Sequence, residues 1–265
     1  MKDDIPRLKG RRAIFGGGIL MLGMLAGWYY GIYQKPGLRI EWEGIVGDYN
    51  YRDLGHSLNE CLQARGFSKR FYTQVLMRSN KWFSGWNCRN VGAPDLIYTL
   101  NFEPDKGYIY FCQRDDGTEI KGRHYFPAQT LNNIEFESFW REHKGKNALC
   151  RQIRDVLKDV ALGKRVLFHC EAGRDRAGAF AALLSAGLAE VAGMRMEEMI
   201  AAIECDYRKS SSLASHKYGR MDSFVNGMMD SGGVAYFLKS RCDVELDLLL
   251  RASTQFLYPQ VANRK

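Results

Sequence analysis

Residues 165–192 carry the pattern that most restricts the fold of this chain. Arg165–His169 is apolar enough for a short buried strand, and residues 176–192 are almost entirely Ala, Leu and Gly, as in a buried helix. A short loop joins the two segments. A strand, a loop and a helix in this order are typical of α/β proteins, whose ligands bind where the strands end. We therefore expect an α/β fold, with a central sheet flanked by helices and a ligand site at this loop.

Other segments agree with this fold class. The chain has 265 residues, 46% of them hydrophobic, which excludes a disordered or collagen-like protein and allows a core that needs no disulfides. Residues 95–102 and 107–112 are apolar and aromatic enough to be strands. Periodic apolar residues predict helices at 149–162, where Gly163 would end the helix, and at 196–207, 221–229, 234–239 and 244–252.

The loop offers a set of groups suited to an anion. It reads His169-Cys170-Glu171-Ala172-Gly173-Arg174-Asp175-Arg176-Ala177-Gly178. Its backbone N–H groups can surround an anion at the start of the following helix. Gly173 allows a tight turn, and Gly178 would let the helix pack closely on the strand. Arg176 can donate two hydrogen bonds to a tetrahedral oxyanion.

The same positive field would lower the pKa of the Cys170 thiol, so that the thiolate could attack a bound phosphate. The simpler alternative makes Cys170 a small buried residue at a strand end and Arg176 a charge at a helix start. The Cys-x5-Arg spacing alone does not exclude that alternative. Together with the apolar strand, His169, the two glycines and the apolar helix, it favours a phosphocysteine mechanism.

These residues resemble the Cys-x5-Arg protein tyrosine and dual-specificity phosphatases, above all their bacterial atypical branch, whose loop reads His-Cys-x-x-Gly-Lys-Asp-Arg-Thr-Gly. Residues 50–55 (Asn-Tyr-Arg-Asp-Leu-Gly), 76–80 (Leu-Met-Arg-Ser-Asn) and 232–238 are similar to three further stretches of that branch. The resemblance spans about residues 45–255. It implies that Cys170 is the nucleophile, that Arg176 holds the phosphate, and that Glu171, Ala172, Gly173, Arg174, Asp175 and Arg176 bind it.

The loop departs from the family pattern at three positions. The hydroxyl that follows the arginine in the family is replaced by Ala177, which predicts a less stabilised thiolate leaving group and slow turnover. Arg174 replaces the family lysine and keeps its charge. Glu171 places an acid beside the site, which disfavours highly phosphorylated ligands.

The general acid is the hardest role to assign from the sequence. Many relatives carry an Asp on a separate upstream loop, but residues 126–129, where that loop is expected, hold no carboxylate. Glu103, Asp105, Asp115 and Asp116 are alternatives, but these residues fit solvated turns better than the role of an acid. In the resembling branch an Asp within the loop has this role, which implies Asp175.

Four further residues are expected to support the site. His169 precedes the nucleophile and is expected to stabilise the loop through hydrogen bonds. Arg52, Asp53 and Arg78 are expected to brace the site through salt bridges, with direct substrate contact as the alternative.

The N-terminal segment predicts a membrane anchor. Residues 13–33 contain no charge, and aromatic residues cluster at their far end. As a helix, this segment is just long enough to span a hydrocarbon core of about 30 Å. Five Lys/Arg precede this segment, which predicts a cytoplasmic tail at 1–12 and places the rest across the membrane, in bacteria the periplasm. A cleaved signal peptide and a buried core helix are the alternatives. Gly23, Gly27 and Gly31 share one helix face and suggest a homodimer.

The predicted organisation continues with a linker at 34–47, a catalytic domain at 48–255 and a C-terminal tail at 256–265. Residues 1–39 carry a net charge of +5 out of +8 for the chain, so the basic balance is a poor argument for nucleic-acid binding. The seven cysteines show no zinc-ligand spacing, and no metal or cofactor is expected. If the domain is exported, some of the other six cysteines could pair and leave Cys170 free.

The leading hypothesis is a membrane-anchored phosphatase acting on phosphotyrosine, and also phosphoserine or phosphothreonine, in proteins. A phosphoinositide or other phospholipid phosphatase is the close alternative, because an anchor would hold the site near lipid headgroups. A non-catalytic phosphate-binding module is favoured by Ala177 and opposed by Cys170 and Arg176. A sulfurtransferase fits the loop less well.

Overall fold

The structure is a computed structural model that describes residues 50–100, 109–125, 146–211 and 213–259. The predicted tail, anchor and linker at 1–47 lie outside these ranges. None of the helices within these ranges has the length and apolar character needed to cross a bilayer.

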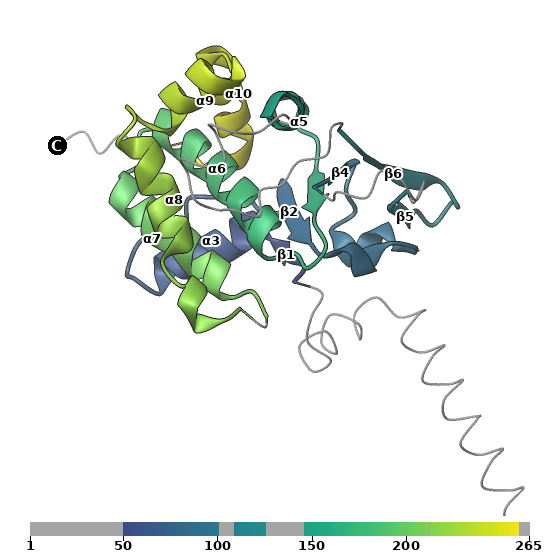
Figure 1. Cartoon of the computed structure of the whole chain (residues 1–265). Helices are drawn as coiled ribbons and strands as arrows, with labels where there is room; N and C mark the ends of the chain where they lie inside the picture. The colour runs from purple at the N-terminus through teal and green to yellow at the C-terminus, as the bar shows by residue number, and fades with distance from the viewer. Residues whose placement is uncertain (1–49, 101–108, 126–145, 212, 260–265) are drawn as a thin grey trace, which may run out of the picture. The chain divides into compact units, whose positions relative to one another are not determined.

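The described part contains a seven-stranded sheet in the order β1-β2-β7-β4-β6-β5-β3. Figure 1 labels five of these strands, β1, β2, β4, β5 and β6. The neighbours β2, β7, β4 and β6 are parallel, β1 and β5 are antiparallel to their inner neighbours, and β3 pairs parallel with β5. The strands are β1 (Arg52–Asp53), β2 (Leu76–Ser79), β3 (Trp86–Asn87), β4 (Leu96–Thr99), β5 (Phe111–Gln113), β6 (Glu119–Arg123) and β7 (Val166–His169). This confirms the mixed α/β class.

The parallel pairing explains where the loop lies. All residues of β2 and β7 are buried, as expected for strands covered on both faces. In the register of the sheet, His169 pairs with Ser79 on one side and with Thr99 on the other. Three parallel strands therefore end together at the point where the loop begins.

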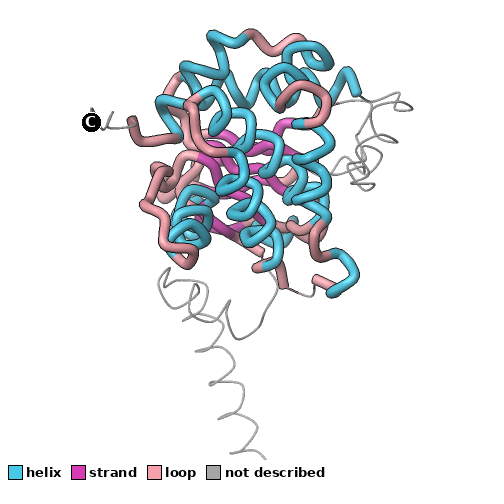
Figure 2. Tube along the Cα trace, turned by 90° about the vertical axis from the view of Figure 1, so that its left-hand side faces the viewer, coloured by secondary structure: helices cyan, strands magenta, loops and turns pink. Residues whose placement is uncertain are grey.

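Helices cover the sheet, and Figure 2 shows them lying over the strands. The α-helices are α3 (Leu54–Gln63), α5 (Lys146–Ala161), α6 (Asp175–Val191), α7 (Met196–Arg208), α8 (Arg220–Met229), α9 (Val234–Cys242) and α10 (Leu246–Phe256). Short 3₁₀ turns are η1 (Lys81–Phe83), η2 (Cys88–Val91) and η3 (Ser215–Lys217). The small, apolar residues of α6 are almost all buried because α7, α8, α9 and α10 pack around this helix.

Most of the expected elements are present with small shifts at their ends. Gly163 lies in the left-handed region (φ +72°) just after α5, as a helix-ending glycine does. The prediction of a strand at 107–112 is largely wrong within the described residues. Residues 109 and 110 are not in a strand, and β5 begins at Phe111.

Three disulfides join parts of this fold. Cys61–Cys205 links α3 to α7, Cys88–Cys112 links η2 to β5, and Cys150–Cys242 links α5 to α9. All seven cysteines lie within the described residues, and Cys170 is the one left as a thiol.

Candidate active site

Cys170 lies buried where β7 ends, at the start of the loop that leads into α6. Its backbone N–H donates to the carbonyl oxygen of Ser79, 3.4 Å away, and so continues the β2–β7 pairing by one residue. The sheet thus holds the nucleophile predicted from the sequence at the carboxyl edge of its parallel strands.

Neighbouring residues hold the loop in place by donating hydrogen bonds to its carbonyl groups. Four successive carbonyl oxygens accept hydrogen bonds: Lys81 N to Glu171 O (3.3 Å), Asn50 Nδ2 to Ala172 O (2.7 Å), and Arg78 Nη2 to Gly173 O (2.8 Å) and to Arg174 O (3.2 Å). A trans peptide has its N–H and C=O groups on opposite sides. The N–H groups from Ala172 to Asp175 therefore face away from these donors and line the inner side of the loop. This is the geometry of an anion-binding nest at a helix N-terminus.

Gly173 is required at its position. Its φ of +66° lies in the left-handed region, and a Cβ atom there would lie 2.7 Å from Asn80 N and 2.8 Å from Asn50 Cβ. The predicted tight turn is confirmed. Gly178 also allows a close approach, but the near neighbour of its absent Cβ is the Tyr207 ring of α7, at 2.8 Å, rather than the preceding strand.

Arg176 lies in the first turn of α6 and is 9% exposed. Its Nη1 donates to the carbonyl oxygen of Leu100, 2.9 Å away, just beyond the end of β4. This bond fixes the orientation of the guanidinium at the same sheet edge as Cys170. The loop and a buried arginine are thus brought together as the sequence predicted.

His169 is a buried structural residue. Its Nε2 lies 2.9 Å from the Thr99 hydroxyl, and the rings of Phe83 and Tyr110 contact it edge-on. Burial lowers the pKa of His169 to about 3, so the ring is neutral at pH 7. Its hydrogen bond with Thr99 joins the ends of β7 and β4.

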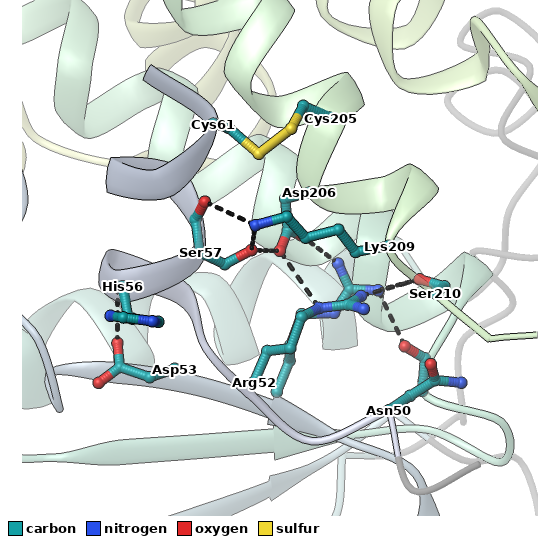
Figure 3. Close-up of polar contacts among 12 residues, drawn as sticks. Asn50, Arg52, Asp53, His56, Ser57, Cys61, Cys205, Asp206, Lys209 and Ser210 are labelled. Carbon is teal, nitrogen blue, oxygen red and sulfur yellow. Dashed lines mark hydrogen bonds and ion pairs between the residues drawn. A yellow bond between two sulfur atoms is a disulfide. The ribbon is translucent and has the colours of Figure 1, made fainter. Parts of the chain in front are cut away.

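Arg52 and Arg78 form a buried network around Asp206 of α7. Figure 3 shows Arg52 beside Asp206. The Asp206 carboxylate accepts hydrogen bonds from Arg78 (2.5 Å) and Ser57 (2.6 Å), and Arg52 Nε lies 3.2 Å from it. Burial alone would raise the pKa of Asp206, but the charges of the two arginines hold it below its usual value. Arg78 joins this carboxylate to the loop carbonyls, so the network fixes the loop to α7.

Asp53 does not make the salt bridge expected of it. Its carboxylate caps α3 by accepting a hydrogen bond from His56 N (3.1 Å), and it also accepts one from Gln74 N (2.5 Å). An Asp directly before a helix is a strong capping residue, which is the physical reason for this difference. Asp53 thus fixes the start of α3 and the backbone at Gln74.

Asp175 is the first residue of α6, and both oxygens of its carboxylate have partners. The Tyr207 hydroxyl donates to Oδ1 (2.6 Å) and Lys217 Nζ donates to Oδ2 (2.7 Å). Burial would raise the pKa of Asp175, but the hydrogen bonds from Lys217 and Tyr207 hold it below its usual value.

Two of the other carboxylates considered as proton donors, Asp115 and Asp116, do not lie at the loop. Asp115 and Asp116 lie in the turn between β5 and β6, which is at the opposite edge of the sheet because β6 runs parallel to β4. There Asp115 pairs with Arg89, and Asp116 accepts a hydrogen bond from Thr118 N. Glu103, Asp105 and residues 126–129 lie outside the described ranges.

Sequence reasoning did not assign a role to Asn50 or to Lys217. Asn50 lies at a positive φ of 45°. It bonds both the loop and Ser211, with Ser211 N donating to its Oδ1 at 2.8 Å. Asn50 opens the Asn-Tyr-Arg-Asp stretch that resembles the family, which was the available signal. No local pattern marks Lys217.

A family model described as the tyrosine phosphatase family matches residues 119–256, more than half of the chain. The chain belongs to the tyrosine phosphatase family. It is accordingly a phosphatase, a hydrolase of phosphoric esters. The match includes β7, the loop and α6, whereas the bracing residues Asn50, Arg52 and Arg78 come from the part of the chain before it. No curated protein matches the chain.

Ala177 is fully buried in the first turn of α6 and brings no hydroxyl to the loop. Within the ranges that the structure describes, no group of three or more His, Cys, Asp or Glu side chains could hold a metal ion. The arrangement can bind a phosphate monoester through backbone amides and Arg176, directly beside a thiol.

Proposed function

We propose that this chain hydrolyses phosphotyrosine in proteins through a phosphocysteine intermediate, with Cys170 as the nucleophile. One observation carries the proposal. The loop that follows Cys170 has its carbonyls bound outward by Asn50, Arg78 and Lys81, which turns its amides toward one centre. The same loop begins with the one cysteine that is not in a disulfide.

The chemistry proceeds in two displacements. The Cys170 thiolate attacks phosphorus and forms an S–P bond while the bond to the leaving oxygen breaks, and that oxygen takes a proton. The loop amides and Arg176 stabilise the negative charge on the transferring group. A water molecule then attacks phosphorus, the S–P bond breaks, phosphate leaves, and Cys170 is again a thiolate.

Asp175 is proposed as the group that donates the proton to the leaving oxygen and removes one from the attacking water. Its support is position, since it belongs to the loop and its carboxylate is fixed by two hydrogen bonds. Glu171, Ala172, Gly173 and Arg174 are proposed to bind the phosphate through the loop amides.

The preference for phosphotyrosine is supported by Trp82 in η1. Trp82 is 62% exposed and lies three residues after the end of β2. Its neighbour Lys81 bonds the loop through both its backbone and its side chain. Lys81 Nζ also lies 5.3 Å from the Trp82 ring centre. An exposed indole beside a phosphate site offers a face on which the ring of a phosphotyrosine can stack. Phosphoserine and phosphothreonine lack this ring and should be poorer substrates.

The surroundings of the domain are also proposed. Three disulfides favour an oxidising compartment, because thiols are kept reduced in the cytosol. This agrees with an anchor at 13–33, a cytoplasmic N-terminus and a periplasmic catalytic domain. The membrane location, and the dimer through Gly23, Gly27 and Gly31, stay predictions.

Phosphate release by the whole chain tests the function. The wild type and Cys170→Ser should be compared on a phosphotyrosine peptide, a phosphoserine peptide and phosphoinositides in vesicles, with the three disulfides verified as intact. We expect release from the phosphotyrosine peptide that Cys170→Ser abolishes. Faster release from phosphoinositides would instead identify a lipid phosphatase. A folded wild type that binds phosphate analogues without turnover would identify a binding module.

A further inference from the structure

Asp175 is held by residues that lie far from the loop in the sequence. Tyr207 lies in the last turn of α7 and Lys217 ends η3. Each donates to one oxygen of the Asp175 carboxylate, at 2.6 and 2.7 Å. The side chains of Asp175 and Lys217 are each only 22% exposed. An ion pair that is mostly removed from water is screened less than a surface pair.

The segment that carries Lys217 is itself fixed to the loop's bracing residues. The Ser210 hydroxyl accepts a hydrogen bond from Arg52 (2.8 Å), and Ser211 N donates to Asn50 (2.8 Å), which in turn donates to the loop. The ion pair between Lys217 and Asp175 therefore joins two segments that are also held together independently.

The groups that face Asp175 all stabilise the negative charge of its carboxylate. Lys217 and the Tyr207 hydroxyl donate to the carboxylate, and Arg174 of its own loop adds a second positive charge. Behind Tyr207, the charges of Arg220 and Arg78 act on the phenol. Lys217, Tyr207 and Arg174 each favour the ionised Asp175 carboxylate over the protonated acid.

We propose that Lys217 is a positioning residue for proton transfer: it fixes the Asp175 carboxylate at the loop and sets the pH range in which Asp175 carries a proton. This rests on the proposed function, in which Asp175 is the proton donor. With Lys217 present, Asp175 loses its proton at low pH, and the enzyme works best in acid. Burial raises the pKa of the Asp175 carboxyl and Lys217 lowers it. Without Lys217, Asp175 therefore keeps its proton to higher pH.

The test is the pH dependence of kcat/KM on a phosphotyrosine peptide for the wild type, Lys217→Gln, Lys217→Arg and Tyr207→Phe. In Lys217→Gln we expect the fall of activity on the alkaline side to move up by about one pH unit, as loss of a close opposite charge predicts. Lys217→Arg should restore the wild-type profile. Tyr207→Phe removes the other donor and should shift the profile in the same direction, which keeps the test valid if Lys217→Gln does not fold.

Lys158→Gln is the matched control, because Lys158 pairs with Asp155 on α5 and not with the loop. It should leave the profile unchanged. A lower rate with an unshifted profile in both Lys217→Gln and Tyr207→Phe would overturn the proposal and leave these residues a structural role. Asp175→Asn distinguishes a failure of the role proposed for Lys217 from a failure of the assignment of Asp175 as the acid. If it abolishes the alkaline limb while both donor variants leave it in place, Asp175 is the acid and only the role of Lys217 fails. If Asp175→Asn changes neither rate nor profile, the assignment of the acid fails.

Discussion

Replacing Asp206 with Asn should destabilise the fold severely, because it removes the negative charge that two buried arginines share. Asn has nearly the same shape as Asp, so the substitution tests the charge alone. Asp206 is buried between Arg52 and Arg78. Burial, together with the positive charge of Arg78, already lowers the pKa of Arg52 to about 10. Without the carboxylate, two buried guanidinium groups face each other without compensation. Breaking a buried ion pair in this way costs about 3–5 kcal/mol of unfolding free energy. For a domain of this size that lowers Tm by about 6–20 °C, at about 2–4 °C per kcal/mol.

Urea denaturation of the oxidised protein measures this loss, and its pH dependence adds a second test. The folded pKa of Asp206 is lowered, so its stabilising contribution is complete above the unfolded pKa of about 3.9 and is lost as pH falls through the folded value. The wild type and Asp206→Asn should therefore differ most near neutral pH and converge in acid, where protonated Asp206 and Asn carry the same charge.

Asp247→Asn is the matched control, since Asp247 is exposed and pairs with Arg251 on the surface of α10. It should change stability by less than about 1 kcal/mol. Asp206→Asn should also lower kcat at temperatures where it stays folded, because Arg78 connects Asp206 to the loop carbonyls. A loss of less than about 1 kcal/mol for Asp206→Asn, or an equal loss at every pH, would refute the reasoning about the buried network.

Three further substitutions test the loop. Gly173→Ala should cost about 1–3 kcal/mol in a thermal melt and lower the affinity for a phosphate analogue measured by calorimetry, because the added Cβ meets Asn80 and Asn50 at a positive φ. Ala177→Ser should raise kcat about tenfold to a hundredfold in steady-state assays by restoring a hydroxyl near the thiolate, and an unchanged kcat would show that the second step is not limited there. Trp82→Ala should raise KM for a phosphotyrosine peptide and leave a phosphoserine peptide unaffected, whereas an equal change on both would exclude stacking.

The loop and its two flanking elements were predictable because their signals are local. An apolar strand, Cys170, a turn glycine, Arg176 and a helix of small residues follow one another directly in the sequence. A buried strand followed by a buried helix leaves few other folds.

The residues that hold the loop could not be predicted in the same way. Asn50 is 122 residues from the carbonyl it binds, and Arg78 is 128 residues from Asp206. Asp206 looks like an ordinary surface residue of an amphipathic helix until the tertiary structure buries it. The pairing of Cys61 with Cys205, directly beside Asp206, likewise depends on α3 packing on α7.

Detection of the phosphocysteine intermediate on Cys170 tests the proposed mechanism most directly. The oxidised enzyme should be mixed with a phosphotyrosine peptide, quenched in acid within the first turnovers and digested, and the peptide that contains Cys170 analysed by mass spectrometry. We predict one phosphoryl group on the Cys170 sulfur, together with a burst of dephosphorylated peptide, because Ala177 leaves the second displacement slow. Steady turnover with no phosphoryl group on Cys170 and no burst, or with the phosphoryl group on another residue, would contradict the proposed mechanism.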